Sequence, residues 1–258
     1  MKRLLPILAC ALLAAGCVSQ TTVETRSVTE SAVGDGHRRA ELHTSLAAQY
    51  YQRGNLAVAL DETRLAEKDD PSYFQTYNVR GLIYMELRED ALARASFEKA
   101  IELAPRDSDV MNNYGWFLCL RGDRDRAMAY FGRVQADPLY STPEKALLNA
   151  GLCMRMAGHN AEAEDFLRRA VNFKPDLAGA LFSLAEILYE KGGMKEAENY
   201  LNRYMRLGEP SLSALVLGVK VARAQGEKAA EDSMLLQLRR RFPDAPQTRG
   251  LMQGAAGK

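Results

Sequence analysis

The chain has 258 residues, of which 47% are hydrophobic and 26% charged, proportions that allow a buried core and exclude a disordered chain or a multi-span membrane protein. A formal net charge of +1 disfavours a nucleic-acid-binding protein that depends on a strongly basic surface. Four Cys without a Cys-x-x-Cys spacing exclude a disulfide scaffold and disfavour a structural zinc site.

Residues 1–16 have the pattern of a signal peptide. A basic start precedes an apolar stretch from Leu4 to Ala15, which is too short to span a bilayer. The stretch ends in Leu13-Ala14-Ala15-Gly16-Cys17 and resembles the bacterial lipobox. The resemblance implies cleavage before Cys17 and a covalent lipid on this residue, which would anchor the protein without spanning the membrane. The alternative is an ordinary secretory signal with an accidental Cys.

Residue 18 is Val rather than Asp, and by resemblance to lipoprotein sorting this favours the periplasmic face of the outer membrane. Residues 17–38 are then the acylated Cys and a tether. The tether is rich in Thr, Ser, Glu and Gly, and it lacks aromatic residues and an apolar period. We expect it to be flexible, because it cannot bury enough surface to offset the entropy lost on ordering.

Most of the remaining chain repeats with a period of 34 residues. Turn glycines recur with this spacing, apart from a missing glycine at Arg88 and a two-residue insertion near residues 139–143. Small residues, larger apolar residues and prolines form further columns with the same period. The small-residue column contains Ala47, Gly81, Gly115, Gly151, Ala185 and Val219. Each unit has two amphipathic stretches of about twelve residues, and such units must stack to cover their apolar faces.

The second unit carries the pattern most fully and resembles the tetratricopeptide repeat, through Tyr77, Gly81, Tyr84, Ala93, Phe97, Ala100 and Pro105. The resemblance implies an all-α fold, an α-solenoid of about six helix-turn-helix repeats in a right-handed superhelix. We predict one six-repeat domain over residues 39–243, with 244–258 as a mobile tail. The sixth unit departs most, with Val219 and Glu231 where small residues are usual.

First helices of such stacks line a concave face that takes a peptide or a partner helix. The repeat register predicts that side chains from the second to fifth units line this groove, with Trp116 as an apolar anchor and the Asn side chains available to a peptide backbone. The predicted groove residues are Asn78, Leu82, Met85, Asn112, Trp116, Leu148, Leu152, Arg155, Phe182 and Tyr189. The alternative is that Trp116 and the Leu residues only pack between helices.

Cys119 and Cys153 fall on the first helices of neighbouring units, with registers that differ by about two positions. An oxidising periplasm permits a disulfide between them, and two buried free thiols are the alternative. We find no catalytic motif, such as Gly-x-Ser-x-Gly, a phosphate-binding loop or His-Glu-x-x-His, and no metal-ligand cluster. We therefore expect a binding protein rather than an enzyme, with no cofactor besides the lipid on Cys17 and neither nucleic acid nor small-molecule substrate as partner.

The order of lipobox, polar tether and six repeats, together with the run from Asn112 to Cys119, resembles the PilW/PilF family of type IV pilus biogenesis lipoproteins, called pilotins. The resemblance implies a protein that binds the pilus secretin and promotes its outer-membrane localisation and multimer assembly, supporting twitching motility. It also implies that the family's Cys pair corresponds to Cys119 and Cys153. The alternative is a repeat lipoprotein that serves as an adaptor for peptidoglycan hydrolases or for outer-membrane barrel assembly.

Overall fold

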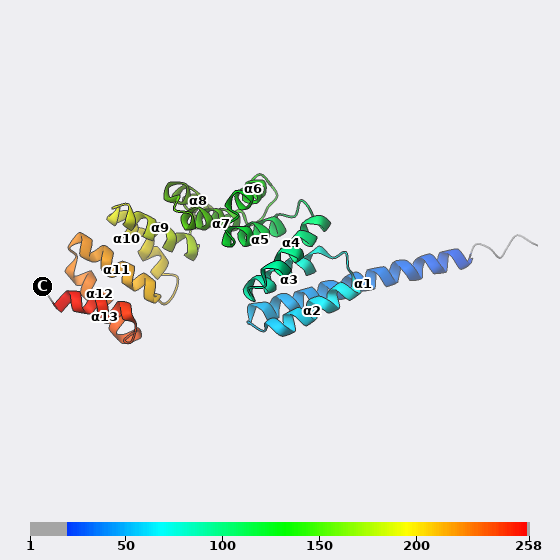
Figure 1. Cartoon of the computed structure of the whole chain (residues 1–258), viewed down its shortest axis with the longest axis horizontal. Helices are drawn as coiled ribbons and strands as arrows, with labels where there is room; N and C mark the ends of the chain where they lie inside the picture. Colours follow the sequence, from blue (N-terminus) through cyan, green and yellow to red (C-terminus); the bar gives the residue numbers. More distant parts are fainter. Residues whose placement is uncertain (1–19, 257–258) are drawn as a thin grey trace, which may run out of the picture. The chain divides into compact units, whose positions relative to one another are not determined.

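The computed structural model describes the backbone of residues 20–256 and the side chains of residues 34–252, and this part of the chain is helical throughout, with no strand (Figure 1). The predicted signal peptide and Cys17 lie outside the described residues. The helices cluster into two compact units, and the boundary between them along the chain lies between Leu103 and Ala104. The predicted domain of residues 39–243 is therefore divided between these units.

The first unit contains two helix pairs. They are α1 (Gln20–Gln52) with α2 (Leu56–Asp69), and α3 (Phe74–Glu86) with α4 (Asp90–Leu103). A buried hydrogen bond of 2.8 Å between the Oγ1 atoms of Thr44 and Thr76 joins α1 to α3. The predicted first and second repeats are thus present as stacked pairs.

The second unit contains four pairs and one further helix. The pairs are α5 (Ser108–Leu120) with α6 (Arg124–Gln135), α7 (Pro143–Met156) with α8 (Asn160–Phe173), α9 (Ala178–Glu190) with α10 (Met194–Met205), and α11 (Leu212–Gln225) with α12 (Lys228–Arg241), followed by α13 (Pro246–Ala256). All six predicted repeats are confirmed, and the fold is a tetratricopeptide-type solenoid.

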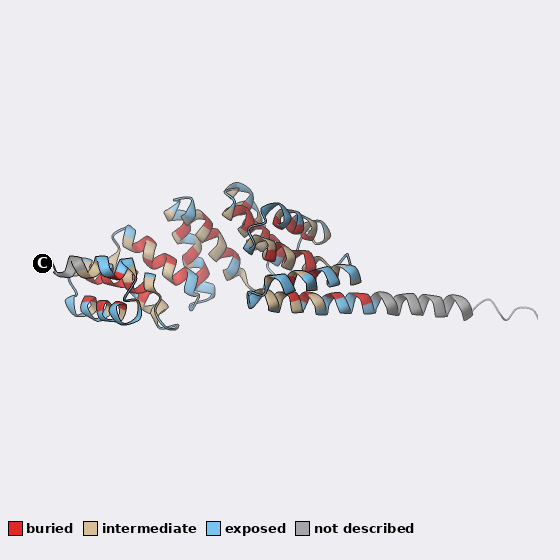
Figure 2. Ribbon diagram, turned by 60° about the horizontal axis from the view of Figure 1, so that its bottom comes forward, coloured by how far each residue is buried: buried red, intermediate tan, exposed pale blue. Residues whose placement is uncertain are grey.

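Glycines allow the two helices of a repeat to approach closely, as the small-residue column predicts. A Cβ atom on Gly81 would lie 2.7 Å from Phe97, and one on Gly115 would lie 2.9 Å from Phe131. Phe97 and Phe131 are fully buried at these seams. Figure 2 shows buried residues along the helix faces that meet each other, with exposed residues on the opposite faces and in the turns.

The turn within each repeat needs a left-handed residue, which five repeats supply as glycine. Gly54, Gly122, Gly158, Gly192 and Gly226 have φ between 75° and 87°. The second repeat has Arg88 at this place, with φ 60°. An L-residue with a side chain pays a steric cost in this conformation that glycine does not.

Replacing Arg88 by Gly is therefore expected to raise the free energy of unfolding by about 1 kcal/mol. Urea unfolding followed by circular dichroism measures the change. The reverse substitution, Gly122→Ala, should cost a similar amount in the equivalent turn. A lower stability of Arg88→Gly would show that the arginine side chain contributes more than the backbone strain costs.

The N-terminal boundary differs from the prediction. The predicted tether ends at residue 38, whereas α1 is continuous from Gln20, and its residues from Gly36 onward belong to the first repeat. His37 Nδ1 lies 2.7 Å from a carboxylate oxygen of Asp70, and Arg39 Nε donates to Asp69 at 2.9 Å. These contacts are polar, so an argument from apolar periodicity could not find them.

The C-terminal boundary also differs, because the predicted mobile tail contains α13. Leu251 and Met252 of this helix pack on a core cluster of the last repeat that includes Leu235 and Leu238. Thr248 is buried as well. The helix buries apolar surface of the sixth repeat, which explains why a short and weakly apolar segment is ordered.

In the sixth repeat, the structure accounts for the two residues that depart from the repeat pattern. Val219 is buried in the small-residue register, and the close approach occurs one residue earlier, at Gly218, where a Cβ atom would lie 2.3 Å from Met234 Sδ. Glu231 is also buried, and it accepts two hydrogen bonds from Arg223, at 2.9 and 2.7 Å. A buried carboxylate paired with a partly exposed arginine thus replaces the usual small residue.

The hydrogen bonds from Arg223 hold the pKa of Glu231 below its ordinary value of 4.5. A carboxyl group with a lowered pKa stabilises the fold at pH values above the unfolded-state pKa, and this stability disappears as the pH falls through the folded-state pKa. We expect Glu231→Gln to lower the urea midpoint at pH 7 and to match the wild type below the lowered pKa. An unchanged difference between the two proteins down to pH 3 would contradict a role for the charge.

Candidate partner-binding face

The first helices of the repeats form a layer in each unit. In the second unit α5 contacts α7, α7 contacts α9, and α9 contacts α11, and in the first unit α1 contacts α3. Each second helix packs against the first helix of its own repeat, and within the units α2, α6, α8 and α10 also pack against the first helix of the next repeat. The layer of first helices is the surface on which the predicted groove residues lie.

The two predicted Asn contacts need correction. Asn112 is buried, and its Oδ1 accepts a hydrogen bond of 3.0 Å from Asn149 Nδ2 of the next first helix. Asn78 of the first unit is also buried, and it interacts with other residues. The Asn112 amide is therefore used between two first helices, and Asn78 is too buried to meet a peptide backbone in the predicted way.

The predicted apolar residues divide into two groups. Leu148, Phe182 and Tyr189 are partly buried and pack against the core of the second unit, and the Phe182 ring lies 5.2 Å from that of Tyr204. Trp116 and Leu152 are half-buried on α5 and α7, as Leu82 and Met85 are on α3 of the first unit. Trp116 and Leu152 are the stronger candidates for contact with a partner.

Charges on the same layer are paired between neighbouring helices. Arg155 of α7 donates to Glu186 of α9, and its other nitrogen lies 3.9 Å from Glu190. These pairs link two successive first helices and leave carboxylate and guanidinium groups partly exposed. Arg155 thus holds the register of the layer in addition to its predicted place on it.

The structure adds a pocket that shares Tyr189 with the predicted groove and extends beyond it. It has a volume of about 430 Å³ and lies between α9, α11 and α13. Its lining comprises Glu186, Tyr189, Glu190, Leu212, Ser213, Val216, Leu217, Lys220 and Gln247. The spacing of Leu212, Val216 and Lys220 marks one face of α11 and could have been read from the sequence. Gln247 could not have been found, since the tail was expected to be mobile.

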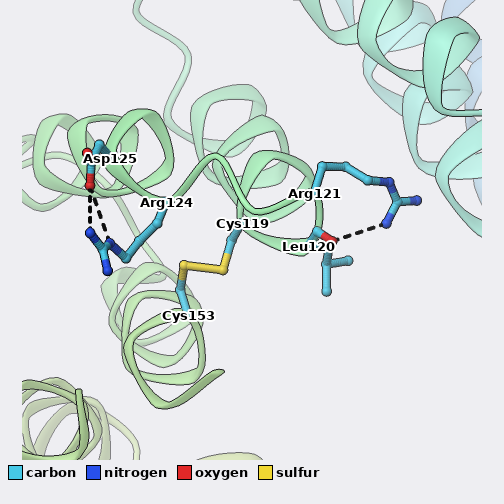
Figure 3. Close-up of a disulfide and its surroundings, with 6 residues drawn as sticks. All are labelled: Cys119, Leu120, Arg121, Arg124, Asp125 and Cys153. Carbon is cyan, nitrogen blue, oxygen red and sulfur yellow. Dashed lines mark hydrogen bonds and ion pairs between the residues drawn. A yellow bond between two sulfur atoms is a disulfide. The ribbon is translucent and has the colours of Figure 1, made fainter. Parts of the chain in front are cut away.

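Cys119 and Cys153 form a disulfide that joins α5 to α7, with their Cα atoms 5.8 Å apart (Figure 3). The difference in register between the two repeats is therefore compatible with a bond. An open depression of about 480 Å³ lies beside it and is lined in part by Arg124, Asp125 and Met156. Figure 3 shows Arg124 turned toward Asp125, with which it forms an ion pair.

Among the residues that the structure describes, no group of His, Cys, Asp and Glu is arranged to hold a metal ion. No helix in this part of the chain is long and apolar enough to cross a membrane. The features that stand out are the first-helix layer, its pocket and the disulfide.

Stacked helix pairs whose two helices approach closely at a glycine, together with a layer of first helices, define a tetratricopeptide repeat protein. Residues 74–107 and 96–129 each match the tetratricopeptide repeat family. The type IV pilus assembly protein PilF of Pseudomonas aeruginosa is 25% identical over 203 residues, which cover 79% of this chain and 81% of PilF.

Solved structures give the same result. The crystal structure of PilW, a widely conserved type IV pilus biogenesis factor, is 32% identical, covers 83% of this chain and 98% of PilW, and has a TM-score of 0.75. A structure of PilF from Pseudomonas aeruginosa, 23% identical, covers 85% of this chain and 99% of that one with a TM-score of 0.77, which is a similarity of fold. The chain belongs to the PilF/PilW family of tetratricopeptide repeat proteins.

Proposed function

We propose that the protein is an outer-membrane pilotin that binds the type IV pilus secretin and promotes its multimer assembly. The observation that carries the proposal is the similarity to PilW over almost its whole length. The similarity to the pilus assembly protein PilF supports the same process. The secretin as partner and the outer membrane as location are inferences from the family resemblance and from the lipobox at Cys17.

The proposed mechanism is binding without a chemical step. The lipid on Cys17 holds the protein at the periplasmic face of the outer membrane, and the first-helix layer binds secretin subunits. Trp116 and Leu152 lie on adjacent first helices that the disulfide joins, so their spacing is fixed before the partner arrives. A fixed binding surface loses less conformational entropy on association than a flexible one.

Replacing Trp116 by Ala is expected to weaken secretin binding at least tenfold, because large aromatic side chains at the centre of an interface carry much of the binding energy. The melting temperature should fall by less than about 8 °C, since Trp116 is half-buried rather than in the core. Leu236→Ala is the matched control, because Leu236 is an exposed apolar residue on the second helix α12. A larger fall in melting temperature for Trp116→Ala would indicate that the residue serves core packing instead.

Co-purification from detergent-solubilised membranes tests the choice of partner. Tagged wild-type protein should retain the secretin, and Trp116→Ala should retain less of it at equal expression. Recovery of a peptidoglycan hydrolase or of barrel-assembly components in its place would contradict the secretin assignment and support the adaptor alternative. A hydrolase assay on the same purified protein should give no activity.

A further inference from the structure

The turns between successive repeats of the second unit lie along one edge, because each joins the end of a second helix to the start of the next first helix. Hydrogen bonds connect neighbouring turns along this edge. Arg203 Nη2 donates to the carbonyl oxygen of Pro175 at 2.8 Å, and Arg241 Nη2 donates to Glu209 at 2.8 Å. At the lengthened turn, Tyr140 Oη donates to Asp109 at 2.9 Å, so the inserted residues are also held against the start of α5.

Three consecutive turns on this edge each expose one large apolar side chain. Leu139 is 89% exposed, Phe173 63% and Leu207 46%, and they are spaced by one 34-residue period. Single exposed apolar residues are common on protein surfaces, but three that recur at the period of the repeats form an ordered row along the edge. The opposite edge, formed by the turns within repeats, is built from glycine and polar residues and has Met156, at 60% exposure, as its large apolar side chain.

Two basic side chains lie next to this row of Leu139, Phe173 and Leu207 in the sequence. Lys174 directly follows Phe173, and Arg206 directly precedes Leu207. Both are exposed, and neither forms an ion pair with a carboxylate in the described part of the chain. Among the acidic residues of these turns, Glu209 is paired with Arg241, whereas Asp137, which accepts a hydrogen bond from Ser108, and the exposed Asp176 keep their negative charge.

We propose that this edge docks on an anionic phospholipid bilayer, with Leu139, Phe173 and Leu207 inserted at the headgroup boundary and Lys174 and Arg206 against phosphate groups. Leu139 and Leu207 lie in separate turns, Phe173 is the last residue of α8, and none of the three lines either pocket described above, which suits a fluid lipid layer better than the surface of a protein partner. Apolar side chains bordered by Lys and Arg are the chemistry that binds membrane interfaces.

Docking of this edge on a membrane does not depend on which protein the first helices bind. An edge that rests on the membrane leaves the layer of first helices uncovered, because the turns lie at the helix ends and not on that layer. The lipid expected on Cys17 would hold the chain near the same bilayer, and the edge would then orient the second unit on it.

Sedimentation with vesicles tests the proposal on the mature chain carrying Cys17→Ser, so that no acyl chain contributes. Vesicles of phosphatidylcholine with phosphatidylglycerol should bind this protein more strongly than vesicles of phosphatidylcholine alone. The triple variant Leu139→Ser, Phe173→Ser and Leu207→Ser should bind at least about tenfold more weakly, since three apolar side chains no longer leave water. Met156→Ser, on the opposite edge, should bind like the parent protein.

Circular dichroism at increasing temperature checks that the triple variant is folded, which we expect because all three side chains are exposed. Failure of the parent protein to sediment with either vesicle would overturn the proposal. So would equal binding by the triple variant, which would show that the three apolar side chains do not contact the bilayer. An equal loss in Met156→Ser would show that the binding does not depend on this edge.

Discussion

Removal of the disulfide by Cys119→Ser and Cys153→Ser is expected to lower the free energy of unfolding of the second unit by about 3–4 kcal/mol. The two residues are 34 positions apart, and the bond restricts the unfolded chain by closing a loop of that length. Both sulfurs are also buried, so hydroxyl groups in their place add a desolvation cost. Urea unfolding of the purified mature protein measures the change.

Chemical reduction of the disulfide in the wild-type protein is the control for the two substitutions. A reducing agent should lower the stability of the wild-type protein toward that of the double variant and leave the double variant unchanged. Identical unfolding curves for oxidised and reduced wild type would show that the covalent link adds no stability, and the proposed fixed spacing of Trp116 and Leu152 would lose its basis.

Replacing Gly151 by Ala is expected to cost about 2–3 kcal/mol, although the change adds a single methyl group. A Cβ atom at this position would lie 2.7 Å from Leu167 Cγ and 3.3 Å from the carbonyl oxygen of Ala163. Leu167 is fully buried, and the carbonyl is backbone, so neither can move aside without repacking the fourth repeat.

Gly132→Ala provides the matched comparison. Gly132 lies inside α6 and is exposed, and a Cβ atom there would meet no atom within 4 Å. Alanine should therefore raise the stability by about 0.5–1 kcal/mol through its higher helix propensity. If both substitutions change the free energy of unfolding in the same direction, the close helix approach at Gly151 is not what makes alanine unfavourable there.

The parts of the fold that could be predicted are those that repeat. Six helix pairs, their glycine turns and the close approaches at Gly81, Gly115 and Gly151 all follow from residue types that recur every 34 positions. The disulfide was also within reach, since the repeat register places Cys119 and Cys153 on neighbouring first helices. Periodicity averages over units, and this makes such a prediction robust to one atypical residue.

The parts that could not be predicted occur once. His37 and Arg39 hold the middle of α1 against the carboxylates of Asp70 and Asp69 at the end of α2, and α13 covers an apolar cluster of the sixth repeat. Asn112 illustrates the limit for the binding face, because the register correctly places it on a first helix but cannot tell whether its amide faces a ligand or Asn149. The choice depends on the neighbouring repeat, which a single-unit pattern does not contain.

The most direct test of the proposed function is a deletion strain, examined by immunoblot for heat- and detergent-resistant secretin multimers beside secretin monomers. We predict that multimers are lost while monomers persist, that the wild-type gene restores them, and that Leu236→Ala restores them better than Trp116→Ala. Unchanged multimers and unchanged twitching motility in the deletion strain would contradict a role in secretin assembly.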